Sequence, residues 1–260
     1  ETNVPDDVKW AGLDESQRTA VKRLYAWIRS CVPDGATSAD LSTFKSEKFR
    51  DEISDYFDKA FLLTYYLWTD YFLAVDQRAK NMMLRTWDGL IWYITYYDGD
   101  TQMGKRNDCF LVYDYTTDRD TYDAEAGKYA FEGRDSWLWN LVLANLDADL
   151  KTQAQALRGV LTTSRVLDML NVEQAGNWCD RAYNKSGELK YILPATQEMY
   201  GKVWPFIYAL QGSNRAHREY FVRNRFALLD AKYGTSNFTS DNIDLYLART
   251  AADTPDVLKI

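Results

Sequence analysis

The spacing of the apolar residues changes after residue 81 and changes back at residue 135, and this pattern limits the fold more than any other feature. Before residue 81 and again after residue 135, apolar residues recur every three or four positions, as in amphipathic helices. Between these parts, residues 90–97 form a run of β-branched and aromatic residues that follows the turn dipeptide Asp88-Gly89. The sequence therefore predicts a mainly α fold with a small central β-hairpin.

Local signals divide the chain further. A helix is expected to begin near Asp14 and to end before the Pro-Asp-Gly turn at 33–35, and one long central helix is expected over 46–74. Residues 109–113 suggest a second short strand, and 115–134 a long loop. Gly234 is expected to end a helix. The later helices are predicted at 135–146, 148–160, 163–177, 194–211, 213–232 and 240–251.

Composition excludes several classes of chemistry. His217 is the one histidine, which excludes multi-histidine metal sites. Cys31, Cys109 and Cys179 lie far apart, so there is no CxxC pair for zinc or redox work. The chain holds 31 Lys and Arg against 38 Asp and Glu, a net charge of −7. We therefore expect neither a nucleic-acid groove nor binding to an anionic membrane surface.

No targeting or membrane-spanning segment is visible. The first ten residues are polar, and charges interrupt every apolar stretch well before the ~20 residues that a membrane helix needs. The chain opens with Glu1 rather than Met, which suggests a piece of a longer protein.

Aromatic residues are abundant, with 19 Tyr, 11 Phe and 9 Trp. Such side chains bury large areas in cores and also dominate protein interfaces. We expect mainly an aromatic core, with an interaction surface as the alternative. A basic stripe is expected to pair with the chain's acidic residues: Arg215, His217, Arg218, Arg223 and Arg225.

One ordered set of polar residues points to chemistry. Asp76 is followed five positions later by Asn81, and Asp98 closes the aromatic run. Protein kinases use this order: an Asp receives the substrate's proton, an Asn holds Mg²⁺, and an Asp after a strand holds the bridging Mg²⁺. Taken alone, this spacing is a weak signal, and it favours a helix cap at Asp76 and a polar turn at 98–104 over a catalytic site.

The surrounding sequence resembles the spore-coat protein kinase (CotH-like) family. The resemblance covers residues 50–115, including 71–81 and the closure Tyr97-Asp98-Gly-Asp100-Thr-Gln-Met-Gly104, and more loosely 223–234. It implies a kinase-like catalytic (C-terminal) lobe over 46–260 behind a helical lead-in at 1–45, with ATP and Mg²⁺ as cofactors. Asp76 would be the catalytic base, and Asp98 and Asn81 metal ligands assisted by Asp100. The flanking Arg78 and Lys80 could contact phosphate.

The chain departs from that family in its first fifty residues. They contain no G-x-G-x-x-G and no strand-borne Lys, both of which a kinase uses to hold ATP. Segments of this kind also resemble parts of large bacteriophage structural or tail-associated proteins. The leading hypothesis is therefore a structural or assembly module of a virion or tail, which binds other protein chains in the virion or in the cytoplasm of an infected bacterium. The alternative is an ATP- and Mg²⁺-dependent protein Ser/Thr kinase lobe with a protein substrate.

Overall fold

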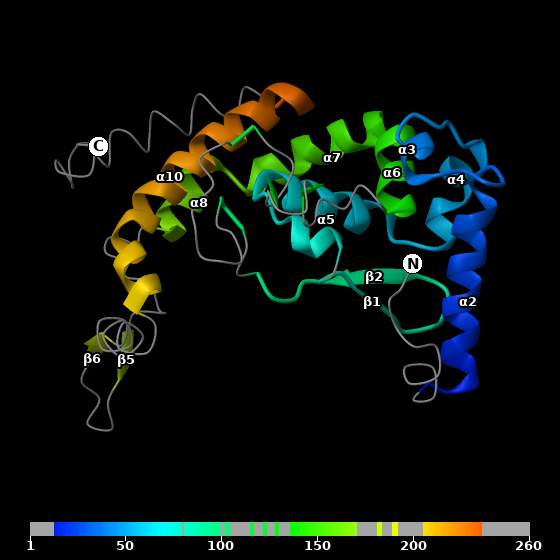
Figure 1. Cartoon of the computed structure of the whole chain (residues 1–260), viewed down its shortest axis with the longest axis horizontal. Helices are drawn as coiled ribbons and strands as arrows, with labels where there is room; N and C mark the ends of the chain where they lie inside the picture. The colour runs from blue at the N-terminus through cyan, green and yellow to red at the C-terminus, as the bar shows by residue number, and fades with distance from the viewer. Residues whose placement is uncertain are drawn as a thin grey trace. The chain divides into compact units, whose positions relative to one another are not determined.

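The computed structural model describes residues 13–79, 81–99, 102–104, 115–116, 122–123, 128–129, 136–170, 181–183, 189–191 and 205–235. Helices dominate these residues, and short antiparallel strand pairs complete them (Figure 1). The predicted mainly α class with a small hairpin is confirmed. The predicted segments 109–113 and 240–251 lie outside the described residues.

The chain divides into two compact units. Unit 1 comprises 1–69, 75–99 and 122–153, and unit 2 comprises 70–74, 100–121 and 154–260. The described elements of unit 1 are α2 (Glu15–Ser30), α3 (Ser38–Leu41), α4 (Glu47–Glu52), η1 (Ile53–Asp55), most of α5 (Lys59–Tyr71), η2 (Val75–Arg78), β1 (Met83–Thr86), β2 (Trp92–Thr95), β3 (Tyr122–Asp123), β4 (Lys128–Tyr129), α6 (Trp137–Asn145) and the start of α7 (Asp147–Val160).

Unit 2 holds the last residues of α5, the second half of α7, and further elements after it. These are α8 (Thr163–Leu170), β5 (Arg181–Tyr183), β6 (Leu189–Tyr191) and α10 (Pro205–Tyr233), with α8 packed against α10. Among the residues that the structure describes, no helix is both long enough and apolar enough to cross a membrane.

The single helix expected over 46–74 is wrong, because the chain breaks between α4 and α5. Phe57 forms a parallel bridge with Trp92, and the Trp92 amide donates to the Tyr56 carbonyl oxygen at 2.7 Å. Asp58 then starts α5 by accepting the amide hydrogen of Phe61 at 3.0 Å. The hairpin thus takes up the backbone groups that a continuous helix would have used.

The two helices expected at 194–211 and 213–232 are also wrong where they are described, because α10 runs unbroken through Gly212. Its end follows the prediction: Gly234 has φ +74, a left-handed conformation that glycine adopts without a Cβ penalty. The starts of α2 and α6 follow the sequence too, since Asp14 and Ser136 accept hydrogen bonds from the first turns of these helices.

Aromatic side chains fill the core of unit 1, as expected. The Trp27 ring stacks on Tyr56 with centroids 4.1 Å apart and on Phe49 at 5.5 Å. The Trp139 ring of α6 stacks on Tyr65 of α5 at 6.3 Å. These contacts pack α2 against α4 and, separately, α6 against α5.

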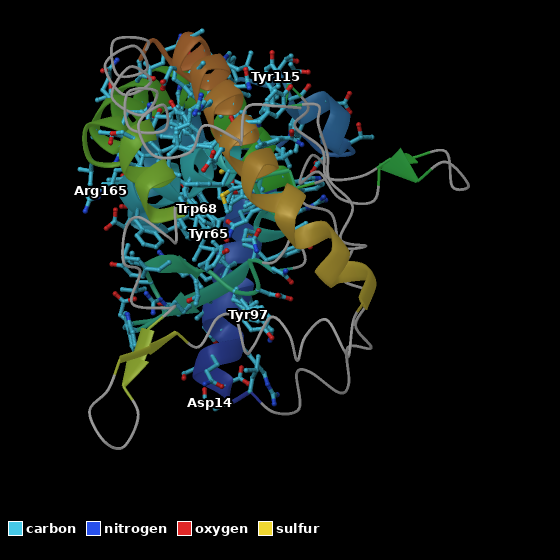
Figure 2. All side chains as sticks on the ribbon, turned by 90° about the vertical axis from the view of Figure 1, so that its left-hand side faces the viewer. Asp14, Tyr65, Trp68, Tyr97, Tyr115 and Arg165 are labelled. Atoms are coloured by element: carbon cyan, nitrogen blue, oxygen red, sulfur yellow. The ribbon has the colours of Figure 1, made fainter. Side chains whose placement is uncertain are left out.

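Two ion pairs are buried in unit 2. Arg158 of α7 pairs with Asp230 of α10 through its Nε at 2.8 Å, and both side chains are fully buried. Arg225 donates to the Asp70 carboxylate at 2.8 Å and to the carbonyl oxygen of Tyr115 (Figure 2) at 2.9 Å. The expected pairing of the basic stripe is confirmed for Arg225.

Candidate functional site

The segment from Asp76 to Asn81 forms a closed loop in unit 1. The Asp76 carbonyl oxygen accepts hydrogen bonds from the amides of Ala79 at 3.1 Å and Asn81 at 2.9 Å. The five-residue spacing that suggested chemistry therefore has a backbone cause, because one carbonyl group holds both ends of the turn. The side chains of Asp76 and Asn81 are both buried.

Aromatic side chains from two helices fix this loop from the core. The Tyr65 hydroxyl of α5 donates to the Gln77 carbonyl oxygen at 2.9 Å, and the Trp139 indole N–H of α6 donates to the Arg78 carbonyl oxygen at 3.0 Å. Tyr65 and its helix neighbour Trp68 are labelled in Figure 2. Because η2 is short, these tertiary bonds supply partners for carbonyl groups that a short helix leaves open.

The β1–β2 hairpin carries the chain from this loop to Asp98. Its strands pair antiparallel, with Met83 opposite Thr95 and Thr86 opposite Trp92. Asp88 organises the turn by accepting from the amides of Leu90 at 2.8 Å and Ile91 at 3.0 Å. These backbone bonds hold the pKa of the Asp88 carboxyl below its usual range.

Two amide side chains join the loop to the end of the hairpin. Gln77 Nε2 donates to the carbonyl oxygens of Tyr97 at 3.0 Å and Asp98 at 2.7 Å. Asn81 Nδ2 donates to the same Asp98 oxygen at 3.3 Å. The structure thus brings Asp76, Asn81 and Asp98 into one region, joined through the Asp98 main chain.

The backbone at Asp98 is constrained. Its φ is +55, which is uncommon for a residue with a side chain. The next residue is Gly99, where a β-carbon would overlap the Tyr96 hydroxyl. Tyr97, labelled in Figure 2, is exposed beside it. Such backbone conformations persist where the surrounding contacts enforce them, and they cluster at functional sites.

The remaining predicted site residues differ in position. The Asp98 side chain is exposed, whereas Asp76 is 0% exposed. Arg78, predicted to contact phosphate, is buried, and its guanidinium carbon lies 5.5 Å from the centroid of the Tyr66 ring. Lys80 and Asp100 lie outside the described residues. Sequence reasoning missed Gln77, because a single polar residue between Asp76 and Arg78 breaks no pattern.

The oxygen-bearing side chains in this region are of the types that bind hard cations. Carboxylate and amide oxygens are the ligands that Mg²⁺ prefers, and one or two carboxylates with phosphate oxygens suffice for it. The described side chains bring two carboxylates, Asp76 and Asp98, and two amides, Gln77 and Asn81. Within the described ranges, no cluster of three or more His, Cys, Asp and Glu side chains has metal-binding geometry. A cation here would therefore depend on amide oxygens as well.

The hairpin also exposes a group of large apolar side chains, which we call the hairpin apolar face. Trp87 at its turn is 83% exposed, more than any other large hydrophobic residue described. The face comprises Met83, Leu84, Trp87, Leu90, Tyr96 and Tyr97. Large apolar side chains exposed along one short segment are candidates for a protein interaction site.

The chain matches no protein-family model, and no similar protein was found among curated proteins or solved structures.

Proposed function

We propose that this chain is a structural or assembly module of a bacteriophage virion or tail protein, built on a CotH-kinase-like fold. It acts by binding other protein chains, and its own copies first, through the hairpin apolar face. The observation that carries the proposal is the exposure of Trp87, 83%, at the tip of a hairpin that also exposes Met83, Leu84 and Leu90. The phage origin rests on the sequence resemblance.

The turn that presents this face is held in place. The Arg23 guanidinium of α2 donates to the carbonyl oxygens of Leu90 at 2.9 Å and Asp55 at 3.1 Å. Thr86 Oγ1 accepts from the Gly89 amide at 3.0 Å. A surface fixed before binding loses little conformational entropy when it docks, which favours association.

Sedimentation equilibrium of the whole chain tests the proposal. The wild type is expected to self-associate as its concentration rises. A Trp87→Ser/Leu90→Ser variant should associate roughly 30-fold more weakly, because truncating a central interface aromatic costs about 2 kcal/mol. Tyr25→Ser is the matched control, since Tyr25 is an exposed aromatic residue of α2 rather than of the hairpin. A wild type that stays monomeric, or a control that weakens equally, overturns the proposal.

A second candidate function is an ATP- and Mg²⁺-dependent protein Ser/Thr kinase lobe. The joining of the loop to Asp98 by Gln77 and Asn81 favours it. In that reaction the γ-phosphoryl group of ATP passes to a substrate hydroxyl, the hydroxyl proton passes to the Asp76 carboxylate, and ADP leaves. Mg²⁺, when bound, would neutralise charge on the phosphates. It ranks second because a general base must contact its substrate, and the Asp76 side chain is fully buried.

Calorimetric titration of ATP with Mg²⁺ tests this second function. The kinase function predicts binding that requires the metal and is lost in Asp98→Ala. Asp88→Ala is the control, because it removes an exposed aspartate from the same hairpin. Absence of ATP binding by the folded chain, with and without metal, would exclude ATP as a ligand of this chain.

A further inference from the structure

Gln77 has a buried oxygen atom that the described contacts leave without a partner. The Gln77 side chain is 0% exposed, and its Oε1 accepts no hydrogen bond from any described group. A buried polar atom without a hydrogen-bond partner destabilises the folded state, because it has lost the water that solvated it in the unfolded chain. In native proteins an ordered water or an ion commonly completes such a site.

The direction of this oxygen follows from the nitrogen on the same carbon. Nε2 donates to the main-chain oxygens of Tyr97 and Asp98, and neither oxygen can donate in return. Rotating the amide by 180° would place oxygen against oxygen, so the orientation is fixed by the network. Oε1 belongs to the same side-chain amide and therefore lies near the Asp98 main chain. Gln77 directly follows Asp76 in the sequence.

We propose that Gln77 is part of a divalent-cation site: its nitrogen holds Asp98 in place, and its oxygen is a ligand to the ion. The inference deepens the second candidate function and rests on the same aspartates, although it requires no nucleotide. A cation would give Oε1 the partner that it lacks, and the carboxylate of Asp98, whose main-chain oxygen accepts from Gln77 Nε2, would be a further ligand.

The two roles of Gln77 have separable consequences. Gln77→Leu removes both the donors and the oxygen, while Gln77→Glu keeps an oxygen at the same position but loses the N–H groups that hold Tyr97 and Asp98. A purely positioning residue would make both variants equally weak. A ligand oxygen makes Gln77→Glu the tighter of the two, because a carboxylate binds a divalent cation at least as well as an amide does.

Titration of the whole chain with Mn²⁺ alone, followed by the loss of the free-ion electron paramagnetic resonance signal, tests the proposal. We expect Gln77→Leu to bind Mn²⁺ about 10- to 100-fold more weakly than the wild type, with Gln77→Glu clearly tighter than Gln77→Leu. Gln153→Leu is the matched control, because Gln153 is a partly buried glutamine of unit 1 whose Nε2 donates to Thr64. It should bind as the wild type does.

Each other outcome of the Mn²⁺ titration refutes a specific part of the proposal. If Gln77→Leu binds Mn²⁺ as tightly as the wild type does, the role of Gln77 is refuted and the second candidate function still stands. Equal weakness of Gln77→Leu and Gln77→Glu, in folded proteins, refutes the ligand oxygen. A wild type that binds no Mn²⁺ refutes the cation site itself. If Gln77→Leu does not fold, Gln77→Glu is compared with Gln153→Leu. Binding of Mn²⁺ by Gln77→Glu as tight as by Gln153→Leu supports the ligand oxygen, and binding about 10- to 100-fold weaker refutes it.

Discussion

Asp230→Asn should destabilise unit 2 strongly, because the replaced carboxylate is the buried partner of Arg158. Asp230 accepts from Arg158 Nε at 2.8 Å and from a second guanidinium nitrogen at 3.1 Å. It also accepts from the hydroxyls of Tyr71 at 2.9 Å and Thr235 at 2.6 Å. Burial raises the pKa of Tyr71, so its hydroxyl stays protonated and donates throughout the physiological range.

The size of the effect follows from burial. Both members of the pair are fully buried, and removing one charge of such a pair costs about 3–5 kcal/mol, because the other is left without compensation in a medium that solvates it poorly. The exposed pair between Lys151 and Asp147 has the same N–O distance, 2.8 Å. Asp147→Asn should cost less than about 1 kcal/mol, since water replaces the lost partner. The two variants differ in burial and in the further hydrogen bonds that Asp230 accepts.

Urea unfolding followed by far-ultraviolet circular dichroism measures both variants. A third protein, Arg158→Met/Asp230→Leu, removes the whole pair and should be more stable than Asp230→Asn, because no charge remains buried. It should still fall below the wild type, since Arg158 also donates to Thr163 and Leu161. The reasoning fails if Asp230→Asn unfolds within about 1 kcal/mol of the wild type, or if the double variant is the less stable one.

Three further predictions concern single residues. Burial raises the pKa of the Cys31 thiol to about 11, so in a Cys109→Ser/Cys179→Ser background the folded chain should react with a disulfide reagent at pH 8 far more slowly than the unfolded chain; equal rates would contradict this. The backbone bonds of Ile91 and Leu90 lower the pKa of Asp88, so its contribution to stability is full above the unfolded value of about 3.9 and is lost as pH falls through the lower folded value. Asp88→Asn should therefore flatten the loss of urea stability between pH 5 and pH 2, and an unchanged slope would count against it. Gly234 has φ +74 with open space around it, so Gly234→Ala should lower the free energy of unfolding by about 1 kcal/mol through backbone strain alone; no change in the urea midpoint would show that the backbone relaxes.

Features set by neighbouring residues could be predicted from the sequence. The cap at Asp14, the helix start at Ser136 and the stop at Gly234 each depend on residues within one helical turn, and all three are present. The break between α4 and α5 was missed because its cause, the bridge between Phe57 and Trp92, joins residues that only the folded chain brings together. Propensity cannot report such contacts.

The candidate site divides in the same way. The spacing of Asp76 and Asn81 marked the loop, and the aromatic run marked the strand that leads to Asp98. The atoms that join them could not be predicted, since Gln77 reaches a main-chain oxygen 21 positions away. The pairing of Arg225 with Asp70 in unit 2 was still harder to predict. The two residues are 155 positions apart, and Arg and Asp are usually found at the surface.

The hairpin links the two proposed functions, and this makes them separable by experiment. β2 has four residues, so at about 3.3 Å per residue its ends lie on the order of 10 Å apart. Trp87 and Leu90 lie at the turn, whereas Asp98 follows the other end. If the two sites are independent, Trp87→Ser/Leu90→Ser loses self-association and keeps Mn²⁺ binding, whereas Gln77→Leu loses Mn²⁺ binding and keeps self-association. If each of these variants loses both properties, the hairpin moves as one element. A cation at Asp98 would then also control how the hairpin apolar face is presented to a partner.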